Sequence, residues 1–83
     1  MMAAADKKKN PEKNDQLITV FGRNVLKHRK QRGLTQQALA DLCDVDYITI
    51  SRIERNISNT TISTIAIIAK ALDIDPSELL KQD

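Results

Sequence analysis

Four side chains with strong hydrogen-bond donors lie in one short part of the chain: Gln36, Gln37, Arg52 and Arg55. Amide and guanidinium groups of this kind bind the phosphate oxygens and base edges of nucleic acids. This segment therefore favours the binding of a polyanion over catalysis.

The residues that catalysis requires are nearly absent from the sequence. A single histidine, His28, and a single cysteine, Cys43, cannot supply the ligands of a zinc site, and two glycines cannot form a glycine-rich phosphate loop. The sequence also lacks a recognisable carboxylate pair or a nucleophile beside a base. We therefore expect no enzyme activity, no metal and no cofactor, with Cys43 as a small buried residue in a reducing compartment.

Composition and charge agree with a small binding domain. A chain of 83 residues forms one domain, and 41% hydrophobic with 29% charged residues is ordinary for a globular protein. Aromatic residues make up only 2%, which argues against a platform that stacks the bases of single strands. Residues 14–60 carry a net charge of +2 and residues 61–83 a net charge of −2, so we expect a basic face for a polyanion.

The beginning of the chain differs in pattern from the rest. Residues 1–13 contain four lysines and Pro11 but no apolar periodicity, which predicts a flexible basic arm. Such an arm either stays solvated or enters a neighbouring minor groove. The folded domain is expected to cover residues 14–83.

Apolar spacing and capping residues predict an all-α fold of five helices. The first helix begins at residue 14 or 15 and ends before Gly33. The second and third helices cover residues 35–43 and 47–55, and Asp46 is the expected N-cap of the third.

Two further helices complete the expected fold. The fourth begins after Thr61, and its expected inward positions are Ile62, Ile65, Ala69 and Leu72. Residues 75–78, with the sequence Asp-Pro-Ser-Glu, predict the start of a brief fifth helix. Residues 48–50 alternate weakly, as a strand would, but the helical spacing of Ile50 and Ile53 outweighs that pattern.

The most specific pattern is the pairing of the second and third helices across a three-residue connection, residues 44–46. This is the spacing of a helix-turn-helix, in which the second helix of the pair protrudes from the domain. A protruding helix fits the major groove of B-DNA and places its side chains on base edges.

Several segments of the sequence resemble the lambda-repressor and Cro-like helix-turn-helix domains, the XRE-type transcriptional regulators of bacteria and phages. The matching segments are residues 21–30, 33–40 (Gly-Leu-Thr-Gln-Gln-Ala-Leu-Ala), 50–56 (Ile-Ser-Arg-Ile-Glu-Arg-Asn), 68–72 and 76–80. The likeness covers residues 17–81. It implies a five-helix, lambda-repressor-like domain that regulates transcription by binding specific sequences of double-stranded DNA.

The resemblance also implies roles for individual residues. Base contacts are implied for outward positions of the third helix, namely Tyr47, Ile48, Ser51 and Arg52. Phosphate contacts are implied for Gln36, Gln37, Thr49, Arg55, Asn56 and Asn59. Arg29 and Glu54 match a pair that joins the first helix to the third, so an internal ion pair is expected between them.

Two acidic residues depart from the family's pattern near the expected DNA surface. Asp44 replaces the glycine that is usual at the turn, and aspartate accepts left-handed backbone geometry better than most residues. Asp46 brings an acid close to the phosphates, so we expect backbone amides to bind its carboxylate.

One recognition helix reads only a few base pairs, so we expect a homodimer that binds palindromic operators. The expected dimer contact is an outward face of the fourth helix formed by Ile67, Thr64 and Ala71, although a singly exposed isoleucine can also be without consequence. Residues 53–56 and 59–62 resemble the controller proteins of restriction-modification systems, and a phage repressor or an antitoxin fits nearly as well.

The competing function is a protein-interaction module, in which the same scaffold binds a regulator and has little specific affinity for DNA. Such a module would have a neutral or acidic third helix, whereas Arg52 and Arg55 are basic. We therefore expect double-stranded DNA and a second copy of the chain as partners, with no membrane and no small-molecule ligand. The expected location is the cytoplasm, at the nucleoid.

Overall fold

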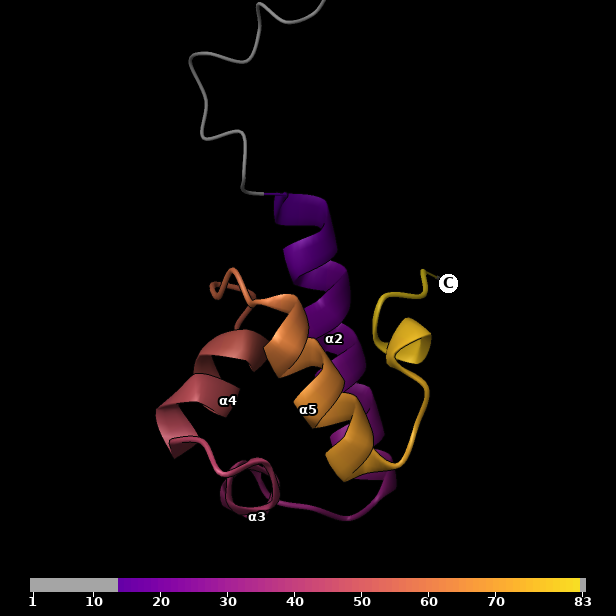
Figure 1. Cartoon of the computed structure of the whole chain (residues 1–83). Coiled ribbons are helices and arrows are strands. Elements are labelled where there is room, and N and C mark those ends of the chain that lie inside the picture. The colour runs from indigo at the N-terminus through magenta and orange to yellow at the C-terminus, as the bar shows by residue number, and fades with distance from the viewer. Residues whose placement is uncertain (1–13, 83) are drawn as a thin grey trace, which may run out of the picture.

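The computed structural model describes residues 14–82, and within this range the chain is helical with no strand. Four α-helices follow one another: α2 (Asp15–Gln31), α3 (Gln36–Cys43), α4 (Tyr47–Glu54) and α5 (Ile62–Leu72). Helices α4 and α5 and the element that follows α5 pack against the long helix α2, whereas α3 packs against α4 and α5 (Figure 1). The expected all-α helix-turn-helix fold is confirmed. The basic arm expected at residues 1–13 lies outside the described residues.

The expected count of five helices is not confirmed for α-helices, because the last element, η1 (Pro76–Leu79), is a single turn of 3₁₀-helix. Its start was predicted correctly: the Asp75 side chain accepts a hydrogen bond from the Ser77 backbone N–H at 2.9 Å, which holds the pKa of Asp75 below its ordinary value. The turn does not extend because the buried Asn24 amide donates to the carbonyls of Leu79 and Lys81, at 3.0 Å each. Those carbonyls are thereby drawn towards α2.

Buried apolar side chains from every element form a single core. The largest fully enclosed side chains are Val25, Leu39, Ile50, Ile53, Ile68, Leu72 and Leu79. The expected inward face of α5 is partly wrong, since Ile62 is 83% exposed whereas Ile68 is fully buried. Ile62 is the first residue of α5, where the chain arrives from the preceding connection and no described element covers it.

Four helices end in the same way, with a left-handed residue followed by an aliphatic one. The left-handed residues are Gly33, Asp44, Asn56 and Asp73, with φ between 57° and 69°. After each of them, the next N–H donates to the carbonyl five residues earlier: Leu34 to Arg29, Val45 to Ala40, Ile57 to Arg52 and Ile74 to Ala69. This is the Schellman pattern, which satisfies carbonyl groups that the end of a helix leaves unpaired.

Helices α2 and α4 come into close contact at Gly22. This glycine is buried, and a Cβ atom built on it would overlap the carbonyl oxygen of Ile53 and the side-chain oxygen of Asn56. The lack of a side chain at Gly22 thus allows the end of α4 to lie directly against α2.

We predict that Gly22→Ala lowers the free energy of unfolding by about 1–3 kcal/mol, the usual cost of overpacking. The cost exceeds the better helix propensity of alanine because the clash involves the backbone of Ile53, which cannot rotate away as a side chain does. Urea denaturation measures the change. The control Ser63→Ala, at an exposed position of α5, is expected to stay within about 0.5 kcal/mol of the parent. An equally small effect of Gly22→Ala would contradict the close contact.

Candidate nucleic-acid interface

The turn between α3 and α4 has the three-residue length that the sequence predicted. Thr35 caps α3, its Oγ1 accepting a hydrogen bond from the Ala38 N–H at 3.0 Å. Asp44 ends α3 in a left-handed conformation, with φ 57° and ψ 44°, and the Val45 N–H reaches the Ala40 carbonyl at 3.1 Å. Aspartate therefore occupies the conformation that favours glycine, and the chain enters α4 directly after it.

The expectation that backbone amides bind the Asp46 carboxylate is wrong. Asp46 is the N-cap residue of α4, but its side chain makes no capping hydrogen bond. The amide that a capping side chain would bind, the Thr49 N–H, instead donates to the Asp46 backbone carbonyl at 2.9 Å. The carboxylate is thus left exposed at the start of α4.

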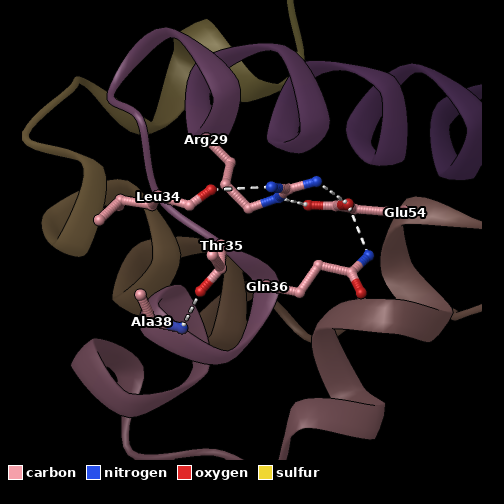
Figure 2. A network of polar contacts seen from close by, with 6 residues as sticks. All are labelled: Arg29, Leu34, Thr35, Gln36, Ala38 and Glu54. Carbon is pink, nitrogen blue, oxygen red and sulfur yellow. Dashed lines mark hydrogen bonds and ion pairs between the residues drawn. The ribbon is translucent and has the colours of Figure 1, made fainter.

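A polar network anchors the opposite end of α4 (Figure 2). Arg29 donates from Nε to Oε2 of Glu54 at 2.6 Å and from Nη2 to Oε1 at 2.9 Å, a bidentate ion pair. The remaining guanidinium nitrogen, Nη1, donates to the Leu34 carbonyl at 2.8 Å, and Gln36 Nε2 donates to Glu54 Oε1 at 2.8 Å. Together these hydrogen bonds join α2, the connection before α3, the start of α3 and the end of α4.

The network is almost enclosed by protein. The side chains of Arg29 and Glu54 are 11% and 4% exposed, so neither charge has much contact with water. The hydrogen bonds that Arg29 donates to Glu54 raise the pKa of Arg29 above its ordinary value. Gln36, for which a phosphate contact was expected, uses its side-chain amide inside this network. The signal for this role in the network was the position of Gln36 directly after the cap residue of α3, where it faces Glu54.

The residues with implied base contacts share the outward side of α4. Tyr47 and Ile48 are 46% and 50% exposed, Arg52 is exposed and Ser51 is half-buried. Ile50 and Ile53, on the opposite side of the same helix, are buried in the core. An exposed arginine and phenol and a half-buried hydroxyl therefore stand beside an exposed aliphatic side chain on a helix whose other face is fixed. Such an arrangement is able to read base edges.

The residues with implied phosphate contacts differ in their surroundings. Gln37 and Arg55 are exposed, and Gln37 Nε2 donates to Asp41 Oδ1 at 2.9 Å. Thr49 is half-buried, and Asn59 is exposed in the connection between α4 and α5.

Asn56 has a structural role that the sequence analysis missed. It is left-handed, with φ 64°, and its Oδ1 is buried near Gly22 without a hydrogen-bond partner among the described residues. The signal was available, since asparagine is one of the few residues other than glycine that adopt this conformation readily.

The expected dimer contact lies away from this network. Ile67 is 44% exposed, while Thr64 and Ala71 are half-buried. Ile67 and Ala71 line a shallow surface depression together with Leu42, Val45 and two charged residues, Asp44 and Lys70.

Cys43 and the acidic residues offer no second kind of site in the described part of the chain. Cys43 is buried, and desolvation raises the pKa of its thiol, so the reactive thiolate is disfavoured. No group of three histidine, cysteine or acidic side chains gathers there in a way that suits a metal ion. None of the described helices combines the length and the apolar character needed to cross a membrane.

Comparison with known proteins assigns the family. A model of the family described as Helix-turn-helix matches residues 25–79, more than half of the chain. The chain belongs to the helix-turn-helix family. This membership, of the XRE type, makes the chain a DNA-binding transcriptional regulator, as the sequence predicted.

Controller proteins are among the relatives of this helix-turn-helix protein. It is 34% identical over 61 residues to the control protein C.SmaI of Serratia marcescens, covering 74% of this chain and 73% of that protein. It is 37% identical over 62 residues to the control protein C.BamHI of Bacillus amyloliquefaciens, covering 74% and 76%. The crystal structure of the restriction-modification controller protein C.AhdI from Aeromonas hydrophila is similar with a TM-score of 0.72 and 35% identity, over 75% of this chain and 94% of that one.

We predict that Glu54→Ala lowers the free energy of unfolding of this helix-turn-helix protein by about 3–5 kcal/mol, because it leaves the enclosed Arg29 guanidinium without a counter-charge. Thermal or urea unfolding followed by circular dichroism measures the loss. The exposed pair of Lys81 and Glu78, with 3.1 Å between its atoms, supplies the control. Lys81→Ala should change stability by about 0–1 kcal/mol, and an equally small effect of Glu54→Ala would refute the anchoring role.

Proposed function

We propose that this protein binds palindromic operators as a homodimer and reads their sequence with α4. The observation that carries the proposal is the outward face of α4, where Tyr47, Ile48 and Arg52 are exposed while the helix itself is fixed by the core and by Glu54. A rigid helix holds its side chains ready for DNA, so little conformational freedom is lost on binding.

Each residue of this face has a distinct role in the proposal. The Arg52 guanidinium forms two hydrogen bonds with O6 and N7 of a guanine, and Ile48 contacts the methyl group of a thymine. Tyr47 and Ser51 supply hydroxyl groups to neighbouring base edges.

Phosphate contacts on both sides of α4 hold the helix in the major groove. Arg55 follows α4 as an exposed cation, and Gln37, Thr49 and Asn59 supply neutral donors. At the start of α3, the backbone N–H of Gln36 adds the favourable field of a helix N-terminus, while its side chain supports Glu54. Asn56 donates through its side-chain N–H₂ group only, since its oxygen is buried.

A dimer follows from the size of the reading surface. One short helix contacts only a few base pairs, and two copies related by a two-fold axis read two half-sites about 34–36 Å apart on one side of the duplex. The relatives C.SmaI and C.BamHI are named control proteins, and C.AhdI is named a restriction-modification controller. We extend that role to this chain: regulation of transcription at promoters in a restriction-modification system, at the nucleoid.

The function is tested by selecting bound duplexes from a random pool at about physiological salt, where non-specific electrostatic binding is weak. We expect enrichment of a palindrome with two half-sites. Enrichment of a single half-site would remove the palindromic homodimer, and no enrichment by folded protein would replace this function with that of a protein-interaction module.

Two arginines distinguish base reading from phosphate binding. We predict that Arg52→Ala weakens binding to the selected operator by about 1–3 kcal/mol and relaxes preference at one base pair of each half-site. Arg55→Ala is the matched control, expected to weaken all duplexes alike and to reduce the salt dependence of binding by about one phosphate contact per copy. Titrations against the operator and its single-base variants measure both effects. A uniform loss with Arg52→Ala would assign Arg52 to the phosphates.

A further inference from the structure

The carboxylate of Asp46 is the exception among the capping side chains of the described chain. At the other four helix starts, the side chain of the N-cap residue accepts a hydrogen bond from a backbone N–H. These N-cap residues are Asn14, Thr35, Thr61 and Asp75. Asp46 stands at the start of α4, yet its side chain accepts no such bond and has no other partner among the described residues. A residue type that caps helices well is thus left with a free acceptor.

This free carboxylate lies at the end of α4 that the proposed binding mode directs at the bases. Helix α4 begins away from α2, and its end is anchored there by Glu54 (Figure 1). Asp46 is exposed, and so are the next two residues, Tyr47 and Ile48. A helix in the major groove contacts base edges mainly through residues near its N-terminus. Asp46 is therefore among the side chains that approach the duplex when α4 enters the groove.

A carboxylate in this position opposes binding to DNA in general. It is negative and can only accept hydrogen bonds, while the phosphates on both sides of the groove are negative as well. Its contacts with water are lost as the duplex approaches, and no described cation pairs with it to offset that loss. The penalty falls on every sequence, and only a hydrogen-bond donor on the DNA relieves it.

Cytosine is the base whose edge suits a group that only accepts. In the major groove, guanine presents the acceptors N7 and O6, thymine presents the acceptor O4, and adenine presents the acceptor N7 beside its amine. Cytosine alone presents an amine, N4, with no acceptor of its own beside it. We propose that the Asp46 carboxylate accepts a hydrogen bond from N4 of one cytosine in each half-site, and so determines the sequence preference at that base pair.

The base pair that Asp46 reads differs from the one assigned to Arg52. The two residues are six positions apart, which corresponds to about 9 Å along the axis of a helix. Successive bases of a strand follow one another at about 3.4 Å along the duplex, so the cytosine belongs to another base pair than the guanine. The inference rests on the proposed function, because it requires α4 to lie in the major groove, and it adds a reading residue to that function.

The competing role for Asp46 is a general one, in which its charge weakens binding to all DNA alike. Asp44 separates the two roles, because it is an exposed carboxylate two residues earlier that belongs to the end of α3. It lines the depression beside Ile67 and is not one of the outward residues of α4. Asparagine accepts the left-handed backbone of this position, so Asp44→Asn removes a nearby charge without straining the turn.

Titrations of Asp46→Ala against the operator selected by the parent protein test the inference. At one C·G pair of each half-site, the parent protein should lose at least about 10-fold in affinity when any of the other three pairs replaces it, whereas Asp46→Ala should bind all four operators about equally. Asp44→Asn is the matched control and is expected to keep the preference of the parent. Asp46→Ser, which retains a residue suited to the N-cap, gives the same test if circular dichroism shows that Asp46→Ala does not fold.

Removal of the amine itself tests the contact from the side of the DNA. The base 2-pyrimidinone is cytosine without the 4-amino group, and it replaces the cytosine in question in the operator. Its weaker pairing with guanine affects both proteins alike, so the ratio of the two losses in affinity isolates the contact. We expect the loss for the parent protein to exceed the loss for Asp46→Ala by at least about 10-fold.

Three outcomes would overturn the inference. In the first, Asp46→Ala binds all duplexes more tightly or unchanged and keeps the sequence preference of the parent, which leaves Asp46 with a general effect of charge at most. In the second, Asp44→Asn loses the same preference. In the third, 2-pyrimidinone weakens the parent and Asp46→Ala by the same factor. Each of these leaves the palindrome selected by the parent, and with it the proposed function, intact, whereas a parent protein that selects no operator overturns the proposed function itself and this inference with it.

Discussion

The orientation of α4 depends on the enclosed ion pair between Arg29 and Glu54. The buried side chains of Ile50 and Ile53 hold α4 on the core. Aliphatic contacts, however, tolerate sliding and rotation more readily than a bidentate ion pair does. The pair defines one geometry, and Gln36 and the Leu34 carbonyl complete the hydrogen bonds of its two members. Because neither charge can be hydrated separately, α4 cannot tilt away from α2 without a large electrostatic cost.

The ends of the helices add a second constraint, which acts through the backbone. The chain has only two glycines, and at three of its four Schellman ends the left-handed residue is Asp44, Asn56 or Asp73. These residues are less flexible than glycine in the unfolded chain, so less entropy is lost when each turn forms. The next residue packs on the core in two of the three cases, Val45 and Ile74, whereas Ile57 is 57% exposed. The direction in which each helix leaves its predecessor is thus encoded locally.

The residues that stabilise the domain are largely distinct from those available for recognition. Arg29, Glu54 and the buried isoleucines fix α4 from behind, while Tyr47, Ile48 and Arg52 project from its other side. Substitutions on the outward face therefore change the surface that we propose to contact DNA, with little effect on packing.

The sequence by itself determined the features that depend on neighbouring residues. The caps Thr35, Thr61 and Asp75, the apolar spacing and the three-residue turn placed the helices and the helix-turn-helix correctly, because each of these signals acts within a few residues. The tertiary structure alone decided the rest. The Asn24 amide donates hydrogen bonds to carbonyls 55 and 57 residues further along the chain and thereby shortens the last helix. Glu54 accepts a hydrogen bond from the side-chain amide of Gln36, which lies 18 residues away in the sequence. Ile62 faces outward because no described element lies over the first turn of α5. Local pattern cannot foresee such outcomes, since each depends on which distant groups folding brings within hydrogen-bond or van der Waals distance.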